Sequence, residues 1–352
     1  MTNININGII IGVDTHKAAH VAVAIDKNGS RLAALSAPAT TNGYLALENW
    51  ACALGAIAAF GIEGTGSYGA GLSRHLLAQG HKVVEVTRPN RQLRYQHGKS
   101  DSLDAEGAAR SVLAGQATAE PKTQTGSAEM IRHLKIARDT AVKCRSQAMV
   151  TLKTLIINAP AALRDTLDQI CGKIALIRYI AAFRPGALTS TTASAKTALR
   201  ALAQRWLTLH EEIQSHDKAL EQLVADRAPT LLASHGISTM TVAEMLILVG
   251  DDPTRIRSEA ALAKLCGVCP IPASSGKTNR FRLNRGGNRQ ANAALYRVAI
   301  VRMRNHPPTL AYVSKRKKEG KSNREIIRCL KRYIVREIFA HLCRPQMSLA
   351  TA

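Results

Sequence analysis

Four acidic residues in the first third of the chain are spaced as a metal-dependent nuclease would need them. Asp14 follows one apolar, strand-like run, and Glu63 follows another just before a glycine-rich turn. A carboxylate at the end of a strand is held rigidly at the edge of a sheet, and the glycines after Glu63 let a substrate backbone approach. Asp101 and Asp104 are three positions apart, so they share one face if this segment is helical.

This acidic quartet predicts a divalent cation, because four carboxylates that converge at one point repel one another strongly unless cations lie between them. The expected ion is Mg²⁺, with Mn²⁺ as an alternative, and the residues fit one ion or two. Two ions about 4 Å apart would stabilise the attacking and leaving oxygens in phosphoryl transfer. Any single member could instead be a solvated surface acid or a helix cap. Asp26 and Glu106 are excluded, since one belongs to a turn and the other to a different helix face.

The charge of the chain points to a polyanionic partner. There are 48 basic and 25 acidic residues in 352, a net charge of +23. Residues 1–120 carry +1, residues 121–228 carry +7 and residues 229–352 carry +15. So large a surplus is costly through self-repulsion unless nucleic acid or an anionic membrane offsets it. The near-neutral first segment and the basic last segment therefore have separate roles.

The elements that must position the acids alternate between strand and helix, which predicts a mixed α/β domain. We expect strands over residues 9–13, 20–25, 31–36, 58–62 and 82–86, and helices over 44–54, 68–79 and 102–113.

Two heptad seams follow, and each predicts a long helix in a coiled-coil arm or hairpin. The first comprises Leu134, Ala137, Ala141, Cys144, Ala148, Thr151 and Leu155; the second comprises Leu199, Leu202, Trp206, Leu209, Ile213, His216, Leu220 and Leu223.

A compact helical domain is expected after Pro229, with helices over 259–265, 290–303 and 323–342 and an irregular basic stretch over 268–289. His235–Ser238 fits either a DNA-contacting helix-hairpin-helix or a plain helical turn. Cys266 and Cys269 have zinc-knuckle spacing without a second pair, so they are assigned to the core. The predicted domains are 1–122, 123–228 and 229–345.

A run of basic residues in the last domain is the candidate nucleic-acid-binding segment. It comprises Lys277, Arg280, Arg282, Arg285 and Arg289. Aromatics make up only 4% of the chain, so this run is expected to contact phosphates rather than to stack on bases. Lys315–Lys318 is a second basic cluster, assigned either to nucleic-acid contact or to a solvated loop.

The motifs resemble, in order and spacing, transposases of the insertion-sequence 110 family, whose relatives include pilin-gene invertases. The resemblance covers about residues 9–342. Its motifs are Gly12–Lys17, Glu63–Gly69, Lys99–Ala105, Pro270–Lys277 and Arg282–Arg289.

The resemblance implies an RuvC-like (RNase H-like) N-terminal domain whose quartet binds Mg²⁺, followed by a mainly helical C-terminal domain that supplies a serine nucleophile. Ser275 corresponds to this serine, with the adjacent Ser274 as the alternative, and it would form a covalent phosphoserine with DNA. The implied partners are double-stranded DNA at element ends and target, a structured guide RNA (bridge RNA) encoded by the element, and further copies of the chain in a dimer or tetramer.

Two other functions fit parts of the same evidence. A structure-selective nuclease of the Holliday-junction type would use water in place of Ser275. A non-catalytic nucleic-acid scaffold would lack acids of the quartet, and all four are present. The seven scattered cysteines, the polar N-terminus and the lack of a long apolar run favour the bacterial cytoplasm and no membrane association.

Overall fold

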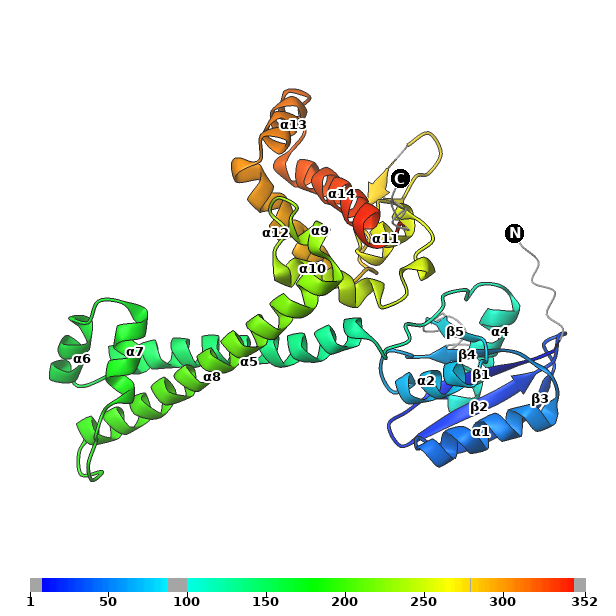
Figure 1. Ribbon diagram of the computed structural model, residues 1–352, viewed down its shortest axis with the longest axis horizontal. Helices are drawn as coiled ribbons and strands as arrows, with labels where there is room; N and C mark the ends of the chain where they lie inside the picture. The colour runs from blue at the N-terminus through cyan, green and yellow to red at the C-terminus, as the bar shows by residue number, and fades with distance from the viewer. Residues whose placement is uncertain (1–7, 88–99, 279, 345–352) are drawn as a thin grey trace, which may run out of the picture. The chain divides into compact units, whose positions relative to one another are not determined.

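The computed structural model describes residues 8–87, 100–278 and 280–344, which divide into two compact units (Figure 1). The first unit comprises Met1–Gly126 and Val249–Arg257, and the second unit comprises Ser127–Leu248 and Ser258–Ala352. Within the described ranges, no helix has the length and apolar character needed to cross a bilayer. The predicted three-domain division stays a prediction.

The first unit is a mixed five-stranded sheet with helices on both faces. Its elements are β1 (Ile9–Thr15), β2 (Ala19–Ile25), β3 (Arg31–Pro38), α1 (Thr41–Leu54), β4 (Ile57–Glu63), α2 (Ala70–Ala78), β5 (Val83–Val86) and α4 (Asp101–Leu113). The strand order is β3-β2-β1-β4-β5, with the first three strands antiparallel and β1, β4 and β5 parallel. The predicted strands and helices of this unit are confirmed. The order is compatible with the RNase H-like fold that the resemblance implied.

The alternation of apolar side chains along β1 explains why both faces of the sheet are covered. Ile9, Ile11 and Val13 belong to a core shared with α1 and α2, whereas Ile10 belongs to a second core shared with α4. Successive residues of a strand point to opposite faces, so a strand that is apolar throughout needs helices on both sides. Figure 1 shows α1 and α2 on one side of the sheet.

Two long helices, α5 (Ser127–Ile157) and α8 (Thr191–Arg227), pack along each other in the second unit. On α8 the predicted seam residues Leu199, Trp206, Ile213 and Leu220 are buried. On α5, burial moves from the predicted Thr151 and Leu155 to Leu152 and Ile156, and Cys144 is exposed.

A straight α-helix drifts relative to a strict heptad, so a seam extrapolated over several turns slips by one position. Two short helices, α6 (Ala161–Asp168) and α7 (Lys173–Ala181), cover the same end of α5. Coiled-coil packing in the strict sense stays a prediction.

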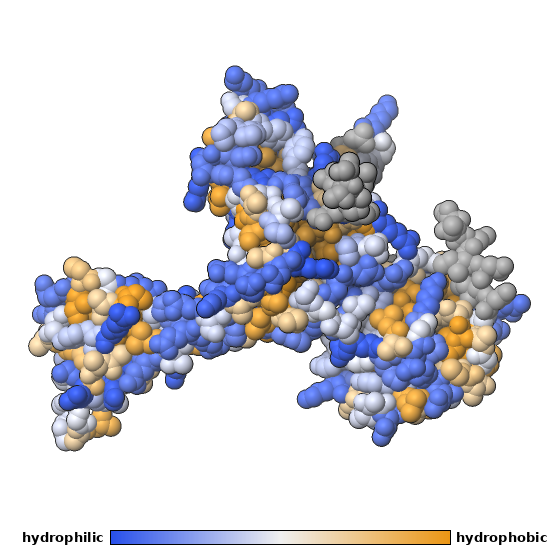
Figure 2. All heavy atoms as spheres, viewed as in Figure 1, coloured by the Kyte–Doolittle hydropathy of each residue, from blue (hydrophilic) through white to orange (hydrophobic). Residues whose placement is uncertain are grey.

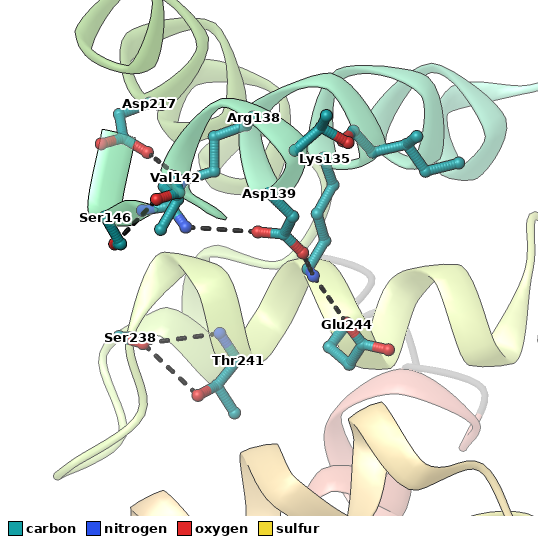
Figure 3. Close-up of polar contacts among 11 residues, drawn as sticks. Lys135, Arg138, Asp139, Val142, Ser146, Asp217, Ser238, Thr241 and Glu244 are labelled. Atoms are coloured by element: carbon teal, nitrogen blue, oxygen red, sulfur yellow. Dashed lines mark hydrogen bonds and ion pairs between the residues drawn. The ribbon is translucent and has the colours of Figure 1, made fainter. Parts of the chain in front are cut away.

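A network of ion pairs connects α5 to α8 and to α10 (Thr239–Val249), as Figure 3 shows. Lys135 Nζ lies 2.6 Å from Asp139 Oδ2 and 2.9 Å from Glu244 Oε2, and Arg138 Nε donates to Asp217 Oδ1 at 2.8 Å. Burial disfavours the ammonium, but the two carboxylates outweigh it and raise the pKa of Lys135. Because Glu244 is a buried acid and pairs with Lys135 of α5, this network fixes α10 against the long helices.

The remaining helices of the second unit are α9 (Pro229–Leu232), α11 (Glu259–Leu265), α12 (Arg289–Asn305), α13 (Pro307–Lys318) and α14 (Asn323–Leu342). The predicted helices over 259–265, 290–303 and 323–342 are confirmed, and Ser258 caps α11 as its sequence suggests. The described part of the basic stretch 268–289 is largely irregular, as expected, with two short strands, β6 (Ile271–Pro272) and β7 (Phe281–Arg282). Lys315–Lys318 form the last turn of α13, so the solvated-loop alternative for this cluster is wrong, and nucleic-acid contact stays a prediction.

The turn before α10 is packed rather than free. Arg302 Nε of α12 donates to the His235 carbonyl at 2.8 Å, and Gly236 has a φ of +74° beside Val301. Ser238 accepts a hydrogen bond from the Thr241 amide at 3.4 Å and so caps α10 (Figure 3). These contacts favour the plain helical turn over a DNA-contacting hairpin.

Candidate active site: an acidic sheet edge and a serine hairpin

The acidic end of β1 brings together three side chains of types that can ligate a metal. Asp14 is buried near the end of the strand, and His16 follows two residues later. His16 Nε2 lies 3.3 Å from Asp14 Oδ2 and 3.4 Å from Asp101 Oδ2. One donor atom from each of the three residues lies within 4.8 Å of the others. This grouping defines the acidic edge of the first unit.

Helix α4 delivers Asp101 and Asp104 to this edge because it begins there and packs closely on β1. The Ser100 hydroxyl accepts a hydrogen bond from the Leu103 amide and fixes the helix start, which places Asp101 and Asp104 in the first turn. A Cβ on Gly12 would lie 1.9 Å from the Ala105 carbonyl oxygen. The absent side chain at position 12 therefore sets how near the two acids come to β1.

Glu63 reaches the same edge from the neighbouring strand. Strands β1 and β4 are parallel and pair Val13 with Ile62, so Glu63 ends β4 beside the end of β1. The Thr15 hydroxyl donates to the Glu63 carbonyl at 2.8 Å, and Gly64 turns the chain with a φ of +69°. Among the described residues, the close three-donor group contains Asp14, His16 and Asp101, with Glu63 and Asp104 outside it.

The electrostatics of the acidic edge fit a bound cation. Burial raises the pKa of Asp14; His16 opposes this shift, while Asp104 and Asp101 add to it. A carboxylate that is costly to ionise beside two further carboxylates is stabilised by a positive ion. Oxygen donors suit Mg²⁺, and an added imidazole is also a ligand for transition ions such as Mn²⁺. The residues present therefore fit a divalent metal; the identity of the ion is a proposal.

His16 belongs to the first motif, Gly12–Lys17, and the structure places it between two acids. The signal was its spacing from Asp14, since positions i and i+2 of an extended chain point the same way. Lys99, the first residue of the third motif, lies outside the described residues.

The serine lies on a β-hairpin in the second unit. β6 and β7 pair Ile271 with Arg282 and Pro272 with Phe281. The same register continues to the tip, where the amides of Ser275 and Thr278 donate to each other's carbonyls at 3.2 and 3.1 Å. Gly276 and Lys277 form the two-residue loop.

Gly276 has a φ of +55°, which a type II′ hairpin turn requires at its first loop position. No atom lies within 4 Å of a Cβ built at Gly276, so the tip is open.

The two adjacent serines have different surroundings. The Ser274 hydroxyl accepts a hydrogen bond from the Arg280 amide at 3.2 Å and donates to the Arg280 carbonyl at 3.4 Å. Ser275 is exposed beside the open tip. The Ser274 side chain thus braces the hairpin, whereas Ser275 lies exposed beside its open tip.

The basic run predicted to bind nucleic acid surrounds this serine. Lys277 is in the loop, and Arg280 and Arg282 follow on the returning strand. Alternate cross-strand pairs point to one face of a hairpin, so both arginines share the face of Ser275. Arg285 and Arg289 lie just beyond, and all five side chains are exposed. Ser275 and the acids belong to different units, so a composite site stays a prediction.

Comparisons with known proteins agree with this pattern. A family model described as a transposase, for the DEDD domain of IS110 elements, matches residues 11–158. Another, described as the transposase IS116/IS110/IS902 family, matches residues 228–314. The chain is 28% identical over 144 residues to an uncharacterized 43.6 kDa protein of insertion element IS110 from Streptomyces coelicolor, covering 40% of this chain and 35% of that one.

Two further relatives are also encoded by insertion elements. The chain is 27% identical over 151 residues to an uncharacterized 42 kDa protein of IS900 from Mycobacterium paratuberculosis, which covers 42% of this chain and 38% of the relative. It is 27% identical over 144 residues to an uncharacterized 44.8 kDa protein of IS116 from Streptomyces clavuligerus, which covers 40% of this chain and 36% of the relative.

The matched stretch spans little more than a third of each of these relatives. Both family models nevertheless describe transposases, and they match separate parts of the chain in order. The protein is thus of the transposase class. It belongs to the IS110 family of transposases.

Proposed function

We propose that this protein is the DNA transposase of a bacterial insertion sequence and cuts and rejoins DNA by strand transfer. The observation that carries the proposal is the acidic edge, where Asp14, His16 and Asp101 meet at the end of a strand in a sheet of RNase H-like order. Metal-dependent phosphoryl transfer needs carboxylates held rigidly on such elements. The first unit is accordingly proposed to be an RuvC-like domain.

The acidic quartet would hold the metal and thereby position the DNA phosphate. His16 lies beside both Asp14 and Asp101. Glu63 lies at the end of β4, and Asp104 lies in the first turn of α4. A bound Mg²⁺ would supply Lewis-acid stabilisation of the charge that develops on the phosphate oxygens. His16 would orient the two carboxylates.

Ser275 is proposed to attack the DNA phosphorus through its hydroxyl oxygen. The bond from phosphorus to the leaving deoxyribose oxygen breaks as the bond to Oγ forms, and the hydroxyl proton passes to a nearby base while the leaving oxygen is protonated. The resulting phosphoserine ester keeps the energy of the phosphodiester. Attack by the hydroxyl of another DNA end then releases Ser275 and rejoins the strand.

The proposed partners follow from the family and the charge. The net charge of +23 suits double-stranded DNA at the element ends and target, together with a structured guide RNA. A homo-oligomer, a dimer or a tetramer, would bring the acids of one subunit to the serine of another, with α5 and α8 as the connecting arm.

The test is to incubate the protein with Mg²⁺, the RNA of its element and DNA containing the element end, and then look for a protein–DNA adduct after denaturation. We expect an adduct with the wild type and with Ser274→Ala, and none with Ser275→Ala. Loss of the adduct only in Ser274→Ala would reassign the nucleophile. Cleavage without any adduct, unaffected by Ser275→Ala, would contradict the transposase proposal and favour a Holliday-junction-type nuclease that uses water.

A further inference from the structure

A large basic cleft in the second unit lies between the end of the serine hairpin and helix α14. Its volume is about 1230 Å³, which exceeds the usual range for a site that takes one small molecule. Phe281–Asn284 and Arg289 line one side, and α14 lines the other. The cationic residues of its lining are Arg282, Arg285, Arg289, Arg316, Lys321, Arg324, Arg328, Lys331, Arg332 and Arg336.

Helix α14 forms its side of the cleft because its residues separate into two faces. Ile326, Leu330, Ile334, Val335 and Ile338 are buried in the core of the second unit. Arg324, Arg328, Arg332 and Arg336 recur every four residues along the side that lines the cleft. A stripe of this kind, opposite the arginines of residues 282–289, makes a groove with positive charge on both walls.

Within the described residues, acids neutralise only part of the positive charge of the cleft. Arg316 pairs with Glu319, outside the lining. Glu325 is the acidic residue of the lining, and it also caps α14 through Ser322. Glu259 pairs with Arg332 and lies 3.6 Å from Arg336 Nε.

Burial, with Arg328 nearby, lowers the pKa of Lys331, whose ammonium donates to Asn292 Oδ1 at 2.8 Å. Burial, with Arg336 nearby, likewise lowers the pKa of Arg332. The remaining positive charge calls for a polyanion.

Aromatic rings lie among these cations. Aromatics are only 4% of the chain, yet Phe281, Tyr296, Tyr312 and Tyr333 all line this cleft. Tyr296 is 47% exposed and Tyr333 is 50% exposed. Tyr312 and Tyr333 meet edge to face, with ring centroids 5.5 Å apart, and the Arg336 guanidinium lies 5.6 Å from the Tyr333 ring centre. The sequence-based expectation that the basic run only contacts phosphates therefore misses what α12, α13 and α14 add.

We propose that this cleft binds unpaired nucleotides, with their phosphates on the arginines and their bases stacked on Tyr333 and Tyr296. Exposed rings within a basic groove are the features by which proteins hold single strands, because every unpaired base offers a face for stacking. The bases of a duplex are already stacked on one another and offer only their edges in the grooves. The proposal rests on the proposed function, since strand exchange and guide pairing both expose unpaired segments.

The surface over α13, beside this site, is mostly hydrophilic, as Figure 2 shows. A hydrophilic surround favours a charged, solvated ligand over an apolar protein segment as the occupant.

The test uses the full chain and three labelled 20-nucleotide probes of one sequence: single-stranded DNA, single-stranded RNA and duplex DNA. Each single strand carries one 2-aminopurine, whose fluorescence is quenched by stacking. Affinity is measured by anisotropy at several salt concentrations. We expect Tyr333→Ala to weaken single-strand binding by about 5- to 100-fold and to remove the quenching. Tyr333→Phe, which keeps the ring, should bind within about threefold of the wild type.

Matched variants outside the cleft provide the controls. Tyr179 on α7 is 47% exposed and does not line the cleft, so Tyr179→Ala should change nothing. Arg328→Gln should weaken every probe and lower the single-strand salt slope by about 0.7, whereas Arg297→Gln on α12, outside the lining, should not. Thermal melting curves of each variant verify folding.

The outcomes show whether the bound strand is RNA or DNA. They also separate failure of the stacking proposal from failure of the proposed function. Tighter binding of the RNA probe would assign the cleft to the guide, and tighter binding of the DNA probe to a displaced DNA strand. Equal losses for single-stranded and duplex probes in Tyr333→Ala, or no loss in either, would overturn the stacking proposal while leaving the Ser275 adduct intact. Absence of that adduct with normal 2-aminopurine quenching would overturn the proposed function and leave the cleft a single-strand site.

Discussion

The acidic edge and the serine hairpin hold their reactive groups in opposite ways. Asp14 and Asp104 are buried, on a strand and a helix that share a core. Ser275 is exposed on a hairpin whose residues 272–278 are all exposed, and its strands are two residues long. Packing fixes Asp14 and Asp104 before any ligand arrives, although Asp101 and His16 of the acidic edge are exposed. The short exposed hairpin instead leaves the serine to be positioned by what it binds.

This difference has a physical logic for a strand-transfer enzyme. Metal ligands must be held within a fraction of an ångström, which buried elements achieve. A nucleophile that first attacks and is later displaced has to approach and leave the phosphate, which suits an exposed loop on a rigid scaffold. Changes at the acidic edge should therefore affect both folding and chemistry, while changes at the hairpin should affect chemistry alone.

The largest effect is expected from Asp14→Asn. Loss of a carboxylate that holds the metal should lower the rate of adduct formation by more than about 100-fold. Mutation of residues that only hydrogen-bond to metal ligands already lowers metal affinity or activity by about 10–100-fold. The measurement is the rate of adduct formation at saturating Mg²⁺. Glu106→Gln is the matched control, because Glu106 lies on α4 in an ion pair with Arg110. Equal losses in both variants would mean that the edge contributes only structure.

Gly12→Ala tests whether packing holds the acids in place. The added methyl group collides with the backbone of α4, so we expect the free energy of unfolding to fall by about 2–3 kcal/mol. Adduct formation should fall as well, because Asp101 and Asp104 move away from β1. Urea denaturation gives the stability. An unchanged denaturation midpoint would show that α4 shifts freely and that the edge is not preorganised.

Gly276→Ala is the matching change at the hairpin. Its φ of +55° strains any other residue by about 1 kcal/mol, but no neighbour lies within 4 Å. We therefore expect the free energy of unfolding to fall by no more than about 1 kcal/mol, less than in Gly12→Ala, and the adduct rate to fall about fivefold. A loss of global stability as large as that of Gly12→Ala would contradict the contrast between the two regions.

The smallest effect is expected from the pH dependence of stability in the first unit. Burial lowers the pKa of His20, which lies fully inside the sheet domain and stacks on Tyr44. The unfolded chain therefore binds a proton more readily than the folded one, so His20 lowers stability as pH falls below about 6.5. His20→Phe should flatten this slope in urea titrations between pH 7 and 5.5. An unchanged slope would assign the pH dependence to other groups.

Much of the first unit could be predicted because its signals are local. An apolar run ending in Asp14 or Glu63 specifies a strand end, and the spacing of Asp101 and Asp104 specifies one helix face. The contact between His16 and Asp101 could not be predicted in this way, since it depends on α4 packing over Gly12. On the two long helices, the predicted seams are confirmed only in part. On α8, Leu199, Trp206, Ile213 and Leu220 are buried as predicted, but burial at Leu202 and Leu223 moves to Ala203 and Val224, and α5 shows the same shift after Ala148.

The sequence by itself determined the four acids and their strand and helix ends, the paired serines, the excess positive charge of the last third and the family. These depend on residue type and on short-range periodicity. Only the tertiary structure decided that His16 bridges two acids and that the Ser274 hydroxyl is used within the hairpin. It also gathered four of the chain's few aromatics into one basic cleft. Contacts of this kind join residues far apart in the chain, and the backbone path between them is set by packing.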